Sequence, residues 1–158
     1  MTYINISEIL NSYPSAFAAI NGSEKYPKVY ARMQFYQKED FVIVATEAEG
    51  LPENQYGRGV FGFHIHSGES CTGDETDPFK NALTHYNPKG YPHPYHAGDM
   101  PPLFGEKGKA FSAFMTKRFS VEDIIGKTVI IHSMPDDFTT QPAGNSGEKI
   151  ACGIIRRK

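Results

Sequence analysis

The sequence predicts a single all-β domain. Short apolar runs alternate with polar residues or are rich in β-branched side chains, and clusters of Gly, Pro, Asn and Asp separate them. Little of the chain has the period of a long helix. A chain of 158 residues suits one domain, which at this size buries roughly 68–70% of its unfolded surface. With 39% hydrophobic and 13% aromatic residues, neither a disordered chain nor a coiled coil is expected.

Charge and hydropathy exclude two classes of partner. The net charge is −2 and the isoelectric point is near 6.3, so the basic stripe that follows nucleic-acid phosphates is not expected. Apolar runs stay well short of the roughly 18 residues that a membrane-spanning helix needs. The first residues, "MTYINISEILNSYPSAF", lack the basic and continuously apolar regions of a secretory signal, which favours a cytoplasmic location.

The first predicted elements lie in the N-terminal third of the chain. Residues 4–10 suit a short helix or an arm that docks on the body. Residues 28–36 form a half-buried strand, because apolar side chains occupy every second position. Residues 41–52 are its expected hairpin partner across residues 37–40.

A strand over residues 59–66 is followed by a stretch without periodicity over residues 67–102. This stretch far exceeds the usual loop of about 4–6 residues, so something other than a hydrophobic core must hold it. Three further elements follow it: a strand over 109–119, a helical turn over 120–126 and a buried strand over 127–133. In the turn, Ser120 is the expected N-cap, Asp123 lies three residues later and Gly126 ends the turn.

The last predicted strand covers residues 149–157. It carries one of the two cysteines, Cys152, whereas the other, Cys71, lies in the long stretch without periodicity. Two cysteines allow one bridge, although a bridge would be unusual in a cytosolic chain.

Six histidines carry the chemical signal. His64 and His66 are two residues apart in a strand, so they project from one face about 6–7 Å apart and can take adjacent positions around one metal ion. The alternative is a buried, hydrogen-bonded pair. The long loop adds His85, His93, His96 and Asp99. Three imidazoles and a carboxylate make a closed tetrahedral zinc set that can organise a loop without a core. Here the alternative is a set of surface histidines.

Five motifs then indicate a family. "GFHIH", "HYNP", "HAGD", "VIIHSMPDD" and "GNSGEKIACGII" occur in the order found in the copper-zinc superoxide dismutases, which the chain resembles from about Ala18 to Ile155. The resemblance implies an eight-stranded antiparallel Greek-key β-barrel of the immunoglobulin-like sandwich kind with long metal-binding loops. Residues 1–17 would then be an N-terminal arm or short helix, and residues 18–158 the barrel.

The resemblance also implies two metal sites with one shared ligand. The implied copper ligands are His64, His66, His85 and His132. The implied zinc ligands are His85, His93, His96 and Asp99, and His85 would bridge the two metals as an imidazolate. Imidazole nitrogens suit both metals.

Further roles follow from the same comparison. Asp136 would link the copper ligand His64 to the zinc ligand His93, a role for which plain turn chemistry is the alternative. Lys149 occupies the position of the family's anion-guiding arginine, and Lys149 and His85 are the implied catalytic residues. Cys71 and Cys152 match the family's disulfide, although two unlinked buried thiols remain an alternative.

The implied reaction is the conversion of superoxide to dioxygen and hydrogen peroxide, with copper and zinc as cofactors. A homodimer is compatible with the resemblance, but family members differ in assembly. Two other functions stay open: a non-enzymatic homologue stabilised by zinc, and a copper-binding module.

The chain departs from the better-known eukaryotic members in three places. Lys149 keeps the positive charge of the family's arginine without its planar fork. The loop over residues 137–149 is short with few charges, so weaker electrostatic steering of superoxide is expected. The segment containing His93 and His96 is also shorter than in the better-known eukaryotic members.

Overall fold

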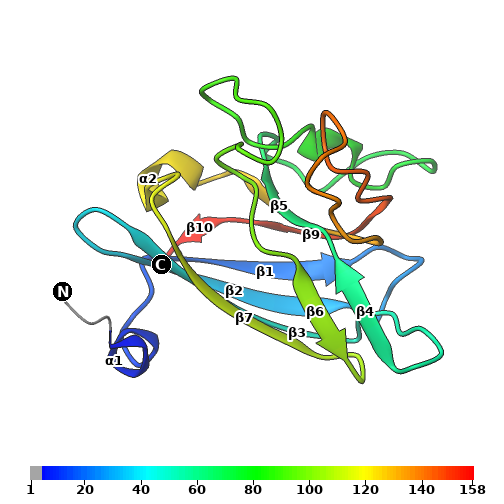
Figure 1. Cartoon of the computed structure of the whole chain (residues 1–158), viewed down its shortest axis with the longest axis horizontal. Helices are drawn as coiled ribbons and strands as arrows, with labels where there is room; N and C mark the ends of the chain where they lie inside the picture. Colours follow the sequence, from blue (N-terminus) through cyan, green and yellow to red (C-terminus); the bar gives the residue numbers. More distant parts are fainter. Residues whose placement is uncertain (1–4) are drawn as a thin grey trace.

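The computed structural model describes residues 5–158 and is dominated by one curled antiparallel sheet of eight strands. The sheet order is β5-β8-β9-β1-β2-β3-β7, and β10 pairs with β1. These strands are β1 (Ala16–Gly22), β2 (Tyr30–Gln37), β3 (Val42–Glu49), β5 (Phe63–His66), β7 (Ala110–Thr116), β8 (Thr128–His132), β9 (Lys149–Ile154) and β10 (Arg156–Arg157). A separate pair joins β4 (Arg58–Phe61) to β6 (Leu103–Glu106). This architecture confirms the predicted all-β barrel (Figure 1).

The core lies on the concave side of the curled sheet. In β2 the predicted alternation is confirmed, because Ala31, Met33 and Phe35 are fully buried while the residues between them are more exposed. Strand β8 is buried along its whole length, as its β-branched composition predicts. At roughly 25 cal/mol per Å² of apolar surface, this burial provides the main stabilisation of the barrel.

Two short helices pack against the sheet. α1 (Ile6–Leu10) begins at Asn5, whose side chain accepts the Glu8 N–H, and Ile9 packs on the outer face of the sheet against Tyr36 and Ile43. Residues 1–4 of the predicted arm lie outside the described residues.

α2 (Val121–Ile124) has the predicted capping box. The Ser120 hydroxyl accepts from the Asp123 N–H, and the Asp123 carboxylate accepts from the Ser120 N–H. Gly126 follows with φ +85°, a left-handed conformation that suits glycine.

The prediction of one strand over residues 59–66 is wrong. Gly62 divides this run into β4 and β5, which belong to different sheets. A side chain at Gly62 would lie 2.7 Å from the Cβ of Ser146, and the Gly62 N–H donates to the Met134 carbonyl at 2.7 Å. Packing against the loop after β8 therefore sets the break, which the apolar pattern does not reveal.

Two strands appear where no strand is predicted. β1 contains three alanines, an asparagine and a glycine among its seven residues, all of weak strand propensity, and its pairing with β2 and β9 holds it in the sheet. β6 follows the long loop and turns into β7 through Lys107 and Gly108, both with positive φ.

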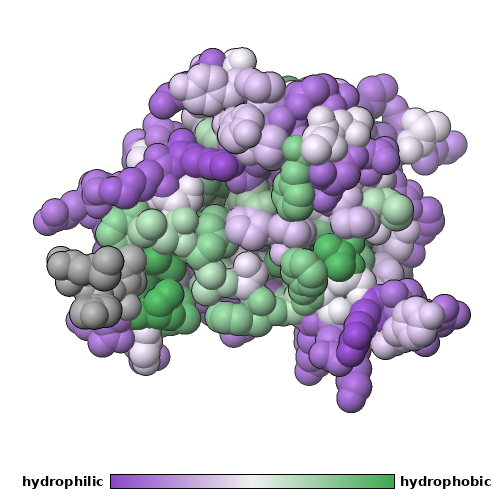
Figure 2. All heavy atoms as spheres, in the orientation of Figure 1, coloured by the Kyte–Doolittle hydropathy of each residue, from purple (hydrophilic) through white to green (hydrophobic). Residues whose placement is uncertain are grey.

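The long loops gather at one end of the sheet (Figure 1). The loop over residues 67–102 contains a short 3₁₀ helix, η1 (Lys80–Ala82), and it meets the loop over residues 133–148 through hydrogen bonds between His93 and Gln141. Figure 2 shows that hydrophilic residues dominate this end, whereas the hydrophobic ones lie over the strands. Within residues 5–158 we find no helix long and apolar enough to cross a membrane.

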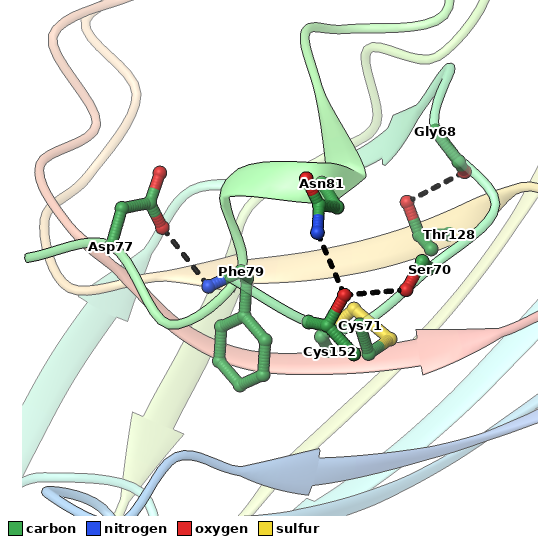
Figure 3. Close-up of a disulfide and its surroundings, with 9 residues drawn as sticks. Gly68, Ser70, Cys71, Asp77, Phe79, Asn81, Thr128 and Cys152 are labelled. Carbon is green, nitrogen blue, oxygen red and sulfur yellow. Dashed lines mark hydrogen bonds between the residues drawn. A yellow bond between two sulfur atoms is a disulfide. The ribbon is translucent and has the colours of Figure 1, made fainter. Parts of the chain in front are cut away.

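The Cys71–Cys152 disulfide is present, as the resemblance implies. It ties the long loop to β9, close to the contacts that Asn81 makes with this loop (Figure 3). Phe79 packs with Cys152 and Ile130 in a small cluster beside the bridge. The loop therefore gains both a covalent anchor and an apolar one.

Candidate metal centre

The fold brings all six histidines together in a buried region between β5, β8 and the long loop. His64 and His66 come from β5, and His132 ends β8. The loop contributes His85, His93 and His96. None of the six histidines is more than 6% exposed. Two groups of close ligand atoms result: His64, His66, His85 and His132 in one, and His85, His93, His96 and Asp99 in the other.

Backbone hydrogen bonds place the loop histidines against β5. The Tyr86 N–H donates to the Ile65 carbonyl at 2.8 Å, and the Ile65 N–H donates to the Gly98 carbonyl at 2.9 Å. A Cβ at Gly98 would lie 2.2 Å from the Ile65 carbonyl oxygen, so this approach requires glycine. His85 thereby lies beside His64, with ring centroids 3.9 Å apart.

In the four-histidine group, one ring nitrogen each of His64, His66 and His132 is hydrogen-bonded to an oxygen acceptor outside the group. His66 Nδ1 donates to the Leu83 carbonyl at 2.8 Å, and His132 Nδ1 donates to the Gly147 carbonyl at 3.3 Å. His64 Nε2 lies 2.7 Å from Asp136 Oδ2. Since carbonyls and carboxylates only accept, the remaining nitrogen of each neutral ring has a free lone pair.

These lone pairs converge on one point. His66 Nε2 and His132 Nε2 are 3.3 Å apart, and neither has a proton to share if the outer nitrogens hold theirs. His64 Nδ1 and His85 Nε2 are buried without a hydrogen-bond partner. Buried acceptors without donors are costly, and a cation bound by imidazoles removes this cost. The donor set therefore fits copper or zinc.

The second group meets at Nδ1 atoms and a carboxylate. His85 Nδ1 lies 2.8 Å from Asp99 Oδ1, and His93 Nδ1 lies 3.1 Å from Asp99 Oδ2. His96 Nδ1 lies 3.3 Å from the same oxygen. Three imidazoles and one carboxylate with no further ligand form a closed set of the structural zinc type. His85 has one nitrogen in each group.

Asp136 lies between the two groups. Its Oδ1 accepts from His93 Nε2 at 2.9 Å, and its Oδ2 accepts from His64 Nε2 at 2.7 Å. Burial tends to raise the pKa of Asp136, but the hydrogen bonds from both histidines and from the Phe138 N–H hold this pKa well below its usual range. A Cβ at Gly144 would lie 2.1 Å from Asp136 Oδ1, so glycine makes room for the link.

Comparison with known proteins shows the family of the chain. The family model "Copper/zinc superoxide dismutase (SODC)" matches residues 29–155. The chain belongs to this family.

Curated relatives carry the same family name. "Superoxide dismutase [Cu-Zn] 2" of Aquifex aeolicus is 33% identical over 144 residues, covering 82% of this chain and 80% of the relative. "Superoxide dismutase [Cu-Zn]" of Legionella pneumophila is 30% identical over 138 residues, covering 82% and 80%. The family and these relatives identify the chain as an enzyme of the copper-zinc superoxide dismutase family, for which copper and zinc are the implied cofactors.

A solved structure has the same fold. The crystal structure of a double mutant of a SOD-like protein from Bacillus subtilis superimposes with a TM-score of 0.75 at 29% sequence identity, covering 89% of this chain and 96% of the other. This similarity supports the Greek-key barrel.

Several residues that hold the loops of the metal centre in place were not predicted from the sequence. The Gln141 side chain accepts from the His93 N–H at 3.0 Å and donates to the His93 carbonyl at 2.7 Å. Arg118 donates from Nη1 to the carbonyls of Pro94, His96 and Asp99 at 3.0 to 3.3 Å. Arg118 lies outside the motifs and Gln141 lies between two of them, and side chains that bind backbone groups leave no signal in a sequence.

The Arg118→Ala substitution is expected to weaken zinc binding by the protein roughly tenfold, within the 10–100-fold range typical of residues that support metal ligands. The reason is that three loop carbonyls lose their shared donor. Competition with a chromophoric zinc chelator measures the affinity. Lys117→Ala is the matched control, because Lys117 pairs with Asp40 and not with this loop. Equal zinc affinity in both variants would contradict the role of Arg118.

The buried histidines favour their neutral, metal-binding form. Burial is the main cause that lowers the pKa of His132 to about 3, and the charges of His64 and Lys149 act in the same direction. Burial likewise lowers the pKa of His66 well below its ordinary value. In the metal-free protein these imidazoles therefore stay unprotonated near neutral pH, as ligation requires.

The ammonium of Lys149 does not point freely into the metal centre. Lys149 Nζ donates to Asp77 Oδ2 at 2.5 Å, and the Lys149 side chain is 16% exposed. Sequence reasoning assigned no role to Asp77, which lies in the disulfide-anchored loop.

Proposed function

We propose that this protein converts superoxide to dioxygen and hydrogen peroxide at a copper site formed by His64, His66, His85 and His132. In the same proposal, His85, His93, His96 and Asp99 hold zinc, and His85 contacts both metals. The observation that carries the proposal is the position of His85, whose Nε2 is buried without a hydrogen-bond partner in the first group while its Nδ1 lies 2.8 Å from Asp99 in the second.

The donor chemistry supports this assignment of metals. Three neutral imidazoles and the imidazolate of His85, which loses both ring protons when it contacts two metals, suit a metal that changes between Cu(II) and Cu(I). The set with a carboxylate suits zinc. Bound copper would supply the one-electron couple by which two superoxide ions and two protons give one dioxygen and one hydrogen peroxide.

The residues of the chain supply order and charge around this chemistry. Asp136 restrains the rings of His64 and His93 through their Nε2 atoms, which keeps the Nδ1 atoms available. His85 Nε2 is the atom at which we expect the protein to hold a proton for the peroxide product. Lys149 supplies a positive charge that attracts the superoxide anion.

The test is metal content together with dismutation on the same samples. Metal content is measured in the protein as purified and after addition of Cu(II). We expect one copper and one zinc per chain, and dismutation activity in proportion to the bound copper. His132→Ala is expected to lose at least 100-fold in activity and to keep zinc, because His132 belongs only to the first group. Met134→Ala is the matched control, since Met134 is 53% exposed and belongs to neither group.

Two outcomes would overturn the proposal. Zinc alone, with added copper neither retained nor activating, would identify a non-enzymatic relative stabilised by zinc. Copper that a chelator removes readily, with no dismutation while copper is bound, would identify a copper-binding module instead.

A further inference from the structure

Lys149 is paired with an acidic side chain from the loop that the disulfide anchors. The Asp77 carboxylate lies 2.5 Å from its Nζ, and the Lys149 and Asp77 side chains are 16% and 36% exposed. Water screens such a partly buried pair less than it screens the exposed pairs that contribute little to stability. Asp77 therefore offsets much of the positive charge of Lys149, the side chain to which we assign the attraction of superoxide.

The loop holds Asp77 in one orientation. Asp77 Oδ1 accepts from the Phe79 N–H at 3.1 Å (Figure 3). Its backbone carbonyl accepts from the N–H groups of Asp74 and Lys80 at 3.0 and 3.1 Å, and its own N–H donates to Asp74 Oδ1 at 3.0 Å. Oδ2 thus remains directed at Lys149, while the rest of Asp77 is engaged by its own loop.

The disulfide links the two partners of the pair. Cys71 precedes Asp77 by six residues in the loop, and Cys152 follows Lys149 by three residues in β9. Phe79, two residues after Asp77, packs in the small cluster that contains Cys152. The disulfide and the apolar contact of Phe79 therefore fix how far the loop carrying Asp77 lies from the strand carrying Lys149.

Lys149 lies beside the four-histidine group. It is the Cα partner of His132 where β9 pairs with β8, and its charge contributes to the low pKa of His132. The neighbouring acid Glu148 is engaged elsewhere, because its Oε1 accepts from Lys25 Nζ at 2.7 Å and from the Tyr26 hydroxyl at 2.5 Å. Asp77 is thus the acid that pairs with Lys149.

We propose that Asp77 is a positioning residue that sets how strongly Lys149 attracts an anion to the four-histidine group. The carboxylate offsets part of the ammonium charge and holds Nζ in one place, so an incoming anion competes with Asp77 for the hydrogens of Lys149. This inference rests on the proposed function, in which Lys149 attracts superoxide. It predicts that loss of the Asp77 charge strengthens anion binding.

The Asp77→Asn variant tests this prediction. The amide oxygen can still accept from the Phe79 N–H, so the loop is expected to keep its conformation. Azide is titrated into the copper-loaded protein and followed by visible absorption. Its Kd is expected to fall about three- to tenfold, the range expected when one charge is removed near a partly solvated site. The rate constant kcat/KM for superoxide is expected to fall more steeply with salt.

Two further variants separate the pair from general charge effects. Glu75→Gln removes the same charge from an exposed position in the same loop and is expected to change the azide Kd less than twofold. In a Lys149→Gln background, Asp77→Asn is expected to have no further effect, because the two residues act through one contact. Unchanged or weaker azide binding in Asp77→Asn, or an equal effect in the Lys149→Gln background, would overturn the inference.

A second readout does not depend on activity. In the zinc-loaded protein without copper, the ¹H–¹⁵N signal of the Lys149 ammonium is expected to be visible through slow exchange and to be lost in Asp77→Asn. If the native protein binds copper without dismutating superoxide while this signal and the azide response behave as expected, the proposed function fails and the role of Asp77 stands. A Lys149 signal that is unchanged in Asp77→Asn would overturn the role of Asp77 even if the protein is an active enzyme.

Discussion

Replacement of both cysteines, Cys71→Ser together with Cys152→Ser, is expected to lower the free energy of unfolding by about 4 kcal/mol. The bridge joins residues separated by 81 positions, so its loss restores much conformational freedom to the unfolded chain. For a domain of this size, about 4 kcal/mol corresponds to a fall in Tm of roughly 8–16 °C. Thermal unfolding followed by circular dichroism measures this fall.

Reduction provides the control for the cysteine variant. Native protein treated with a thiol reductant is expected to unfold at the temperature of the double-serine variant, and the variant itself should not respond to reductant. Comparison at matched metal loading is required, because bound zinc also stabilises the folded state. Equal Tm values for the oxidised native protein and the variant would contradict the stabilising role of the bridge.

Asp136→Asn is expected to weaken copper and zinc binding together, by about 10–100-fold in affinity. Asp136 accepts from a histidine of each group. An amide offers one oxygen acceptor and one NH₂ donor, so one of the two imidazole N–H groups then faces a donor. That ring must change its tautomer or turn away. Metal affinities measured by competition with chelators test the prediction, with dismutation activity as the second readout.

The adjacent residue Asp137 supplies the matched control. Asp137 accepts from Thr139 and Thr140 in its own loop and, within residues 5–158, makes no hydrogen bond or ion pair with a histidine. Asp137→Asn removes the same charge one residue away and is expected to leave both metal affinities within about twofold, a range set by screening of an exposed charge. A loss of zinc affinity alone in Asp136→Asn, with copper unaffected, would refute the joint role of Asp136.

Strand identity could be predicted where one face of the strand is buried. The alternation of Ala31, Met33 and Phe35 appears in the sequence because each of these side chains faces the core. The run over residues 59–66 misled the prediction, since Phe61 and Phe63 are both buried but lie on strands of different sheets. The apolar content of a segment indicates that the segment is buried, but it does not indicate which strand the segment pairs with.

Some properties of this protein were determined by the sequence alone. Paired histidines at a two-residue spacing, the His- and Asp-containing loop, and the motif order all indicate the copper/zinc superoxide dismutase family, because ligand chemistry depends on residue type and order. The capping box at Ser120 could also be predicted, since its partners lie within one turn.

Other properties were decided only by the tertiary structure. The pairing of Lys149 with Asp77, the support of the loop by Arg118 and Gln141, and the space that Gly144 leaves for Asp136 each join segments that are distant in sequence. Local propensities do not encode such contacts. They arise because the barrel and the Cys71–Cys152 bridge bring the loops to one end of the sheet, where the side chains that meet are fixed by packing and not by spacing.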